Sequence, residues 1–148
     1  MNIRIARKED AADLIEFNQA MALETEGKSL DSDTLKSGVE AVFADKKKGF
    51  YVAAEENGKI VGGLMVTFEW SDWRSKWFWW IQSVYILPEF RGRSIYRLLY
   101  EFVKTEAAKA ENVCGFRLYV ENENVNAQKV YEKLGMQRSH YLMYEESI

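Results

Sequence analysis

The chain has 148 residues, of which 47% are hydrophobic and 29% are charged, and its formal net charge is −3. This length predicts one domain over residues 1–148, and this composition is typical of a folded globular protein rather than a disordered one. The weakly acidic balance argues against a nucleic-acid partner, because such partners usually leave a strongly basic footprint.

The chain contains one cysteine and one histidine. A lone cysteine cannot form an internal disulfide, which excludes a disulfide-stabilised secreted module and makes the cytoplasm the expected location. These two residues also cannot supply the usual ligands of a structural zinc site, so no metal is expected. No stretch reaches the roughly 18–20 consecutive apolar residues of a membrane span, and residues 1–10 do not resemble a signal peptide. We therefore expect no membrane partner.

The first part of the chain predicts a short strand followed by two helices. Residues 3–5 alternate between apolar and polar side chains, as in a strand. Apolar residues then recur at helical spacing over residues 11–22, and Gly27 is a suitable stop for that helix. A second helix, extending to residue 43, is expected to begin at Asp31 or Ser32, since either side chain can cap its amides.

Three strands are predicted next. Runs at residues 50–55 and 60–70 flank Asn57-Gly58, and a type I′ hairpin turn needs two such residues that tolerate positive φ. A third run follows at residues 77–86. Together these runs predict an antiparallel meander.

The last part of the chain returns to helical periodicity over residues 95–110. A strand is predicted at 114–120, a helix from about 124 to 133, and a final strand at 140–145. The element order is therefore β-α-α-β-β-β-α-β-α-β. It predicts an α/β (α+β) fold with a mixed, mostly antiparallel sheet and helices on both of its faces.

A predicted anion site lies where the strand ending near Leu87 enters a loop and then a helix. Helix N-termini present unpaired backbone N–H groups and a partial positive charge. Gly92 allows close approach of a phosphate, and Arg91, Arg93 and Arg97 add positive charge. We expect the ligand to be a diphosphate. The alternative is a basic loop that merely begins a surface helix, because short glycine-containing motifs often match by chance.

A second segment, Asn124-Val125-Asn126-Ala127-Gln128-Lys129-Val130-Tyr131-Glu132-Lys133-Leu134-Gly135-Met136, strengthens this hypothesis. Together with the loop, it resembles the GNAT superfamily of acetyl-CoA-dependent N-acetyltransferases over essentially the whole chain. In that family, a strand is followed by Arg/Gln-x-x-Gly-x-Gly/Ala, whose backbone amides hold the CoA diphosphate. A later Asn-x-x-Ala-x-x-x-Tyr-Glu-x-x-Gly-Phe stretch forms the other half of the cofactor cleft.

The first motif matches this chain with two departures. Arg91 occupies the first motif position, Ser94 stands where the family prefers Gly, and Tyr96 stands where it prefers Gly or Ala. Ser94 lacks the conformational freedom of glycine, although its hydroxyl could cap the helix or reach a phosphate oxygen. Tyr96 is bulkier than expected and could narrow the cleft. In the second motif, the departure is Met136 in place of Phe, and the matching residues are Asn124, Ala127, Tyr131, Glu132 and Gly135.

The resemblance implies roles for further residues. Val84 and Ile86 would offer main-chain groups to the pantetheine arm and the acetyl carbonyl, in a slot between their strand and 114–120. Asn124 would cap its helix and contact acetyl-CoA. The implied cofactor-binding residues are Val84, Tyr85, Ile86, Arg91, Gly92, Arg93, Ser94, Ile95, Tyr96, Asn124 and Tyr131.

Acetyl transfer to an amine requires a neutral nucleophile, so the site should accept a proton directly or through water. Glu24 and Glu69 are the tentative candidates for this base. A hydroxyl should protonate the departing CoA thiolate, and Tyr131 is the residue that the family motif implies for this role. Direct transfer, without an acyl-enzyme, is the expected course.

All five tryptophans lie between residues 70 and 80. Three interpretations stay open for them: core packing, a homodimer interface, or a wall that binds an ammonium acceptor beside Asp72. The predicted function is transfer of acetyl from acetyl-CoA to a primary amine of a small molecule or protein. The alternative is a module on the same fold that binds CoA or acyl-CoA as a sensor or scaffold without turnover.

Overall fold

A five-stranded sheet with strand order β1-β2-β3-β4-β5 organises residues 1–118 in a computed structural model that describes residues 1–148. Residues 119–148 form a second unit. The strands are β1 (Asn2–Ile5), β2 (Phe50–Glu56), β3 (Lys59–Ser71), β4 (Lys76–Ile86) and β5 (Val113–Arg117).

The sheet is antiparallel from β1 to β4, and only β4 and β5 run parallel. The β2–β3 turn has Asn57 at φ 51° and Gly58 at φ 77°. The predicted hairpin, meander and α/β fold class are therefore confirmed. A parallel neighbour needs a crossover connection, which α3 (Ile95–Ala110) supplies between β4 and β5.

The two N-terminal helices begin and end where the sequence predicts. The first, α1 (Ala11–Glu26), ends at Gly27, which has the left-handed φ of 62° that glycine adopts without strain. The second, α2 (Ser32–Ala44), is capped by Asp31, whose carboxylate accepts a hydrogen bond of 2.9 Å from the Thr34 amide.

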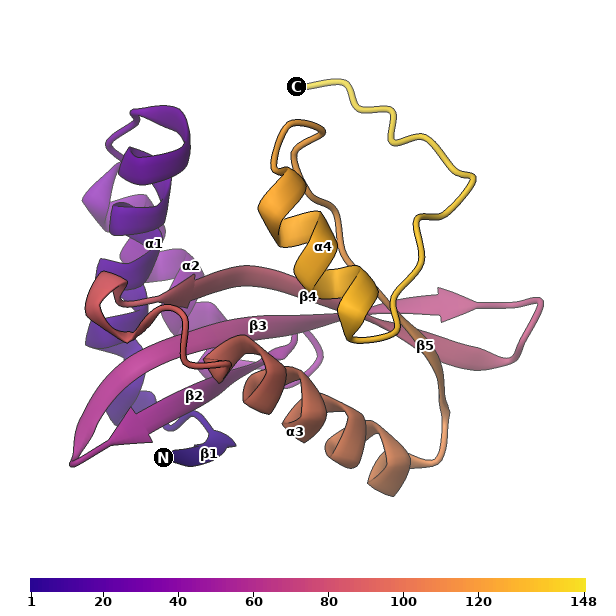
Figure 1. Cartoon of the computed structure of the whole chain (residues 1–148), viewed down its shortest axis with the longest axis horizontal. Helices are drawn as coiled ribbons and strands as arrows, with labels where there is room; N and C mark the ends of the chain where they lie inside the picture. The colour runs from indigo at the N-terminus through magenta and orange to yellow at the C-terminus, as the bar shows by residue number, and fades with distance from the viewer. The chain divides into compact units, whose positions relative to one another are not determined.

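Helices cover both faces of the sheet in this unit (Figure 1). Successive side chains of a strand point to opposite faces. Tyr51 accordingly packs in one buried cluster with Phe17 of α1 and Val39 of α2. Phe50, its neighbour in β2, lies on the opposite face beside the C-terminal end of α3. The predicted helices on both faces are confirmed.

The β3–β4 hairpin extends past β2 (Figure 1). Pairing of β3 with β2 stops at Val66, and residues 67–71 of β3 pair only with β4. Within this hairpin, the rings of Trp70 and Trp77 meet edge to face, with centroids 4.9 Å apart. Between these strands, Trp73 is 87% exposed.

The second unit contains α4 (Val125–Lys133). The predicted start of this helix is confirmed, because the Asn124 side chain accepts a hydrogen bond of 3.2 Å from the Ala127 amide. None of the helices in the structure is both long enough and apolar enough to span a membrane.

Two strand predictions need correction. Residues 140–145 do not form the final strand, and β5 ends at Arg117 rather than at residue 120. A strand requires hydrogen-bonded pairing with a neighbour, whereas alternation of side chains records only a pattern. The last β4–β5 pair is Trp80 with Arg117, and no strand pairs with residues 140–145.

Candidate functional site

The parallel pairing of β4 and β5 ends in the middle of β4. It extends from Trp77 to Trp80, while β4 continues to Ile86 with β3 as its only partner. The Leu87 amide donates to Val61 of β3 at 2.9 Å. Because backbone groups alternate sides along a strand, the main-chain groups of Ile86 and Val84 point away from β3. These are the two residues for which the family resemblance implies main-chain contacts with the pantetheine arm and the acetyl carbonyl.

A β-bulge lies just before these residues. Met65 of β3 pairs with Gln82, and Gly63 pairs with Tyr85, so that Ser83 and Val84 together face Leu64. Ser83 adopts a φ of 51° within the bulge. Bulges bend a strand and re-aim its side chains, and they are frequent beside active sites.

The loop after β4 ends in a backbone arrangement suited to an anion. A short 3₁₀ turn, η2 (Pro88–Phe90), leads into the loop, and Gly92 has a φ of 80°. The first hydrogen bond of α3 is donated by Leu98 to Ser94 O at 3.2 Å. The amides that precede Leu98 in α3 therefore have no helical acceptor and carry the partial positive charge of the helix start.

The structure resolves both departures from the family motif. Ser94 takes up the left-handed conformation itself, at φ 60°, and its side chain makes no capping hydrogen bond. The expectation that its hydroxyl caps the helix is therefore wrong. The ring of Tyr96 is buried and stacks with Tyr100 at a centroid distance of 6.1 Å. The Tyr96 ring therefore lies on the buried side of α3.

Arg91 links the loop to the end of α1. Its Nε donates to Ile86 O at 2.9 Å, and its Nη2 lies 3.2 Å from Glu24 Oε2. Its guanidinium also lies over the Tyr85 ring, 5.3 Å from the centroid. Burial, and then the Glu24 carboxylate, raise the pKa of Tyr85. Arg91, Glu24 and Tyr85 thus form one cluster, which we call the Arg91 cluster.

The other two arginines near the start of α3 have weaker ion-pair partners. Arg93 lies 3.5 Å from Glu56, and Arg97 lies 3.8 Å from Glu101. Both arginine side chains are more than half exposed, and ion pairs of this kind contribute little to stability. Either guanidinium can therefore exchange its carboxylate for a phosphate at small cost.

Glu69, the other base candidate, lies in β3 on the extended hairpin. It accepts hydrogen bonds from Trp80 Nε1 at 2.8 Å and from Arg117 Nη1 at 2.9 Å. The Trp80 hydrogen bond, with Arg117 contributing after it, lowers the pKa of Glu69. Since a weaker proton acceptor makes a poorer general base, this environment counts against Glu69.

The second unit holds the remaining motif residues. Asn124 caps α4, and Gly135 follows the helix with a φ of 96°. Burial raises the pKa of Tyr131, so its hydroxyl carries a proton at neutral pH.

Sequence reasoning missed the Arg91 cluster, and no local signal could have revealed it, because Arg91 and Glu24 are 67 positions apart. No group of three or more His, Cys, Asp or Glu side chains is placed to hold a metal ion.

Comparison with known proteins agrees with the motifs. A family model described as "Acetyltransferase (GNAT) family" matches residues 12–136. Comparison with curated proteins gives no match. Among solved structures, one described as "a possible acetyltransferase" from Clostridium difficile 630 is 46% identical to this chain. That match has a TM-score of 0.92 and covers 99% of this chain and 97% of the other.

Two more distant structures share the fold. An aminoglycoside 6'-N-acetyltransferase from Acinetobacter haemolyticus is 16% identical, with a TM-score of 0.81 and coverage of 100% and 99% of the two chains. A ribosomal-protein-alanine N-acetyltransferase from Brucella melitensis is 14% identical, with a TM-score of 0.81 and full coverage (100%) of both chains. At these identities, the likeness concerns the fold alone.

Proposed function

The chain belongs to the GNAT acetyltransferase family, and from this premise we propose that it transfers an acetyl group from acetyl-CoA directly to a primary amine. The acceptor is an amine of a small molecule or of a protein. The observation that carries this proposal is the loop between β4 and α3. Its left-handed Gly92 and Ser94 lead into helix amides that have no helical acceptor.

These features fit the donor that the family uses. Backbone N–H groups at a helix start bind phosphate, and the two loop arginines, Arg91 and Arg93, with Arg97 in the first turn of α3, add charge around them. The open stretch of β4 offers main-chain groups to the amide-containing pantetheine arm, which can add to the sheet as a strand does. The residues that we assign to acetyl-CoA are Val84, Tyr85, Ile86, Arg91, Gly92, Arg93, Ser94, Ile95, Tyr96, Asn124 and Tyr131.

Acetyl-CoA supplies an acetyl group activated as a thioester. For direct transfer, the amine nitrogen forms a bond to the carbonyl carbon, the carbon–sulfur bond breaks, and the amine loses a proton. We assign acceptance of that proton to Glu24, directly or through water, with Glu69 as the second candidate. We assign donation of a proton to the thiolate to Tyr131, the tyrosine of the family motif, because its raised pKa keeps the hydroxyl protonated at neutral pH.

Binding of acetyl-CoA is tested first, by calorimetry. Ser94→Asp places a carboxylate at the diphosphate position and should weaken binding about tenfold or more. Ser94→Asn is the matched control, since asparagine tolerates the left-handed conformation without adding charge. No binding to the wild type, or equal binding to both variants, would contradict the proposed diphosphate site.

Turnover is tested second, by release of the CoA thiol over a panel of polyamines, aminoglycosides, amino acids and peptides. Amine-dependent thiol release and acetylated product are expected with one class of acceptor. Tight binding of acetyl-CoA without turnover on any amine would instead support the alternative, a CoA-binding sensor or scaffold.

A further inference from the structure

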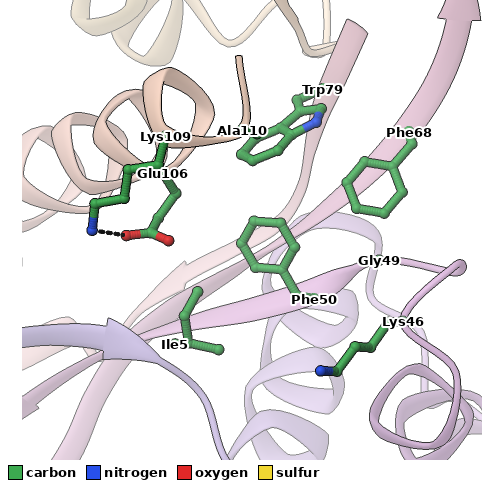
Figure 2. A pocket seen from close by; sticks show the side chains of 9 residues that line it. All are labelled: Ile5, Lys46, Gly49, Phe50, Phe68, Trp79, Glu106, Lys109 and Ala110. Carbon is green, nitrogen blue, oxygen red and sulfur yellow. Dashed lines mark hydrogen bonds and ion pairs between the residues drawn. The ribbon is translucent and has the colours of Figure 1, made fainter. Parts of the chain in front are cut away.

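A pocket of about 500 Å³ lies on the α3 face of the sheet, at the C-terminal end of that helix. Figure 2 shows the aromatic rings of Phe50, Phe68 and Trp79 grouped along it. The other lining residues are Ile5, Lys46, Gly49, Glu106, Lys109 and Ala110. The volume lies within the usual range for small-molecule sites, about 300–1,000 Å³.

The pocket is separate from the proposed acetyl-CoA site. The diphosphate loop precedes the first residue of α3, whereas the pocket is lined by Glu106, Lys109 and Ala110 at the other end. A helix rises about 1.5 Å per residue, so the pocket residues of α3 lie about 17–23 Å along the helix from Ile95 at its start. The proposed acetyl transfer uses none of the lining residues.

Three aromatic side chains from three strands form the apolar wall. Phe50 meets Trp79 edge to face, with centroids 5.4 Å apart, and Phe68 lies 5.8 Å from Trp79. Such rings offer faces and edges to a further flat ring, because aromatic pairs prefer tilted or offset geometry. This wall favours a ligand with a flat aromatic body.

The charges at the rim favour an anionic group on that ligand. Lys109 pairs with Glu106, with Nζ and Oε1 3.0 Å apart (Figure 2). In the turn before β2, the Asp45 carboxylate forms an ion pair with Lys48 at 3.2 Å and accepts a hydrogen bond from the Lys47 amide at 3.0 Å. Lys46 has no acidic partner, so the lining carries one unneutralised positive charge.

We propose that this pocket, which we call the α3 pocket, binds a small aromatic carboxylate. Its ring packs against Phe50, Phe68 and Trp79, and its carboxylate lies at Lys46. This binding needs neither acetyl-CoA nor an amine acceptor.

The test uses 2-naphthoate as the probe and follows the Trp79 indole N–H signal in NMR titrations, identified with Trp79→Phe. We expect saturable binding with a dissociation constant of roughly 1 mM or tighter. The probe should bind equally well in the presence of saturating acetyl-CoA. No binding at several times that concentration, or displacement by acetyl-CoA, would overturn the proposal.

Two matched pairs of variants locate the probe. Ala110→Phe fills the pocket from an exposed helix position and should abolish binding, whereas Ala108→Phe, exposed on the same helix outside the lining, should not. Lys46→Glu should weaken binding about five- to tenfold, whereas Lys47→Glu should leave it unchanged. The neutral 2-naphthamide should lose the dependence on Lys46.

An equal affinity of the wild type and Ala110→Phe would place the probe elsewhere and overturn the proposal. Sedimentation of the wild type and of Ala110→Phe tests whether a second copy of the chain, rather than a small molecule, occupies the same surface. A wild-type dimer that Ala110→Phe dissociates, together with no naphthoate binding, would assign the pocket to contact between copies of the chain.

Discussion

Arg91 and Glu24 form an ion pair between the loop after β4 and the last turn of α1, with Nη2 3.2 Å from Oε2. The same guanidinium donates to the carbonyl of Ile86, at the end of the open stretch of β4. The base candidate is therefore held beside the segment where the acetyl donor is proposed to bind.

Replacing Glu24 with glutamine removes the proposed proton acceptor and keeps a hydrogen-bond acceptor for Arg91. We expect kcat to fall roughly 100-fold or more at neutral pH. The defect should shrink as the pH rises, because the amine then loses its proton to solvent. Steady-state assays across pH measure both effects.

Glu26→Gln is the control for this variant, since Glu26 lies at the same helix end with only a distant partner, Lys28 at 3.9 Å. The stability of Glu24→Gln should change by less than about 1 kcal/mol, because the ion pair is exposed. Full activity of Glu24→Gln combined with a slow Glu69→Gln would assign the base to Glu69.

Tyr131→Phe should lower kcat by about 100-fold while the affinity for acetyl-CoA changes only a few-fold, since it removes a proton donor and little else. An acetyl thioester with a more acidic leaving thiol should restore part of the rate, because that thiolate needs no proton. Tyr141→Phe, at an exposed position, is the control. A large loss of affinity with unchanged kcat would contradict the acid role.

Ser94→Gly should stabilise the protein. A non-glycine residue in the left-handed region is strained by about 1–2 kcal/mol, and glycine loses about 0.5–1 kcal/mol of this gain to chain entropy. The expected net gain, up to about 1.5 kcal/mol, corresponds to a Tm increase of up to about 6 °C. Thermal unfolding measures it, and Ser94→Ala should show no such gain. A lower Tm for Ser94→Gly would contradict the inferred strain.

Asp10→Asn should destabilise the protein by about 2 kcal/mol at pH 7. The buried Asp10 carboxylate lies 2.7 Å from Arg4 Nη1 and accepts from the Arg7 amide at 2.7 Å. The Arg4 hydrogen bond is the main cause that lowers the pKa of Asp10.

The pH dependence of this effect follows from the direction of that shift. Because the folded-state pKa lies below the unfolded value of about 3.9, the stabilisation is present above that pH. It is lost as the pH falls through the lower folded-state pKa. Unfolding of the wild type and Asp10→Asn should therefore converge in acid, while the exposed control Glu9→Gln should follow the wild type. A gap that widens in acid would contradict the assignment.

Trp73→Ser should leave the KM for the amine acceptor unchanged. Trp73 lies in the β3–β4 turn, and Trp77 follows it near the start of β4. Val84 is seven residues further along β4, and a strand rises about 3.3 Å per residue, so Trp77 lies about 23 Å from the proposed acetyl site. The extended hairpin therefore disfavours Trp73 as an acceptor wall. A tenfold rise in KM on this substitution would restore that interpretation.

Much of the fold could be predicted from the sequence because its signals are local. Gly27, Asp31, Asn57-Gly58 and Asn124 mark helix ends and a turn, and each acts through neighbouring backbone groups. The loop to which we assign the diphosphate has a geometry that could be predicted for the same reason, since a strand, a glycine and a helix start are contiguous in the chain. The final strand at 140–145 was wrong because pairing depends on a distant partner.

Length and composition by themselves predicted a small globular protein, the order of its periodic segments predicted an α/β fold, and two short motifs predicted its family. Only the tertiary structure decided which carboxylate pairs with Arg91, where β5 leaves β4, and which aromatic rings line the α3 pocket. The physical reason is that ion pairs, strand pairing and pockets join residues far apart in the chain. The conformation of Ser94 lies between these cases, because its motif position suggested strain and the folded loop fixed its φ at 60°.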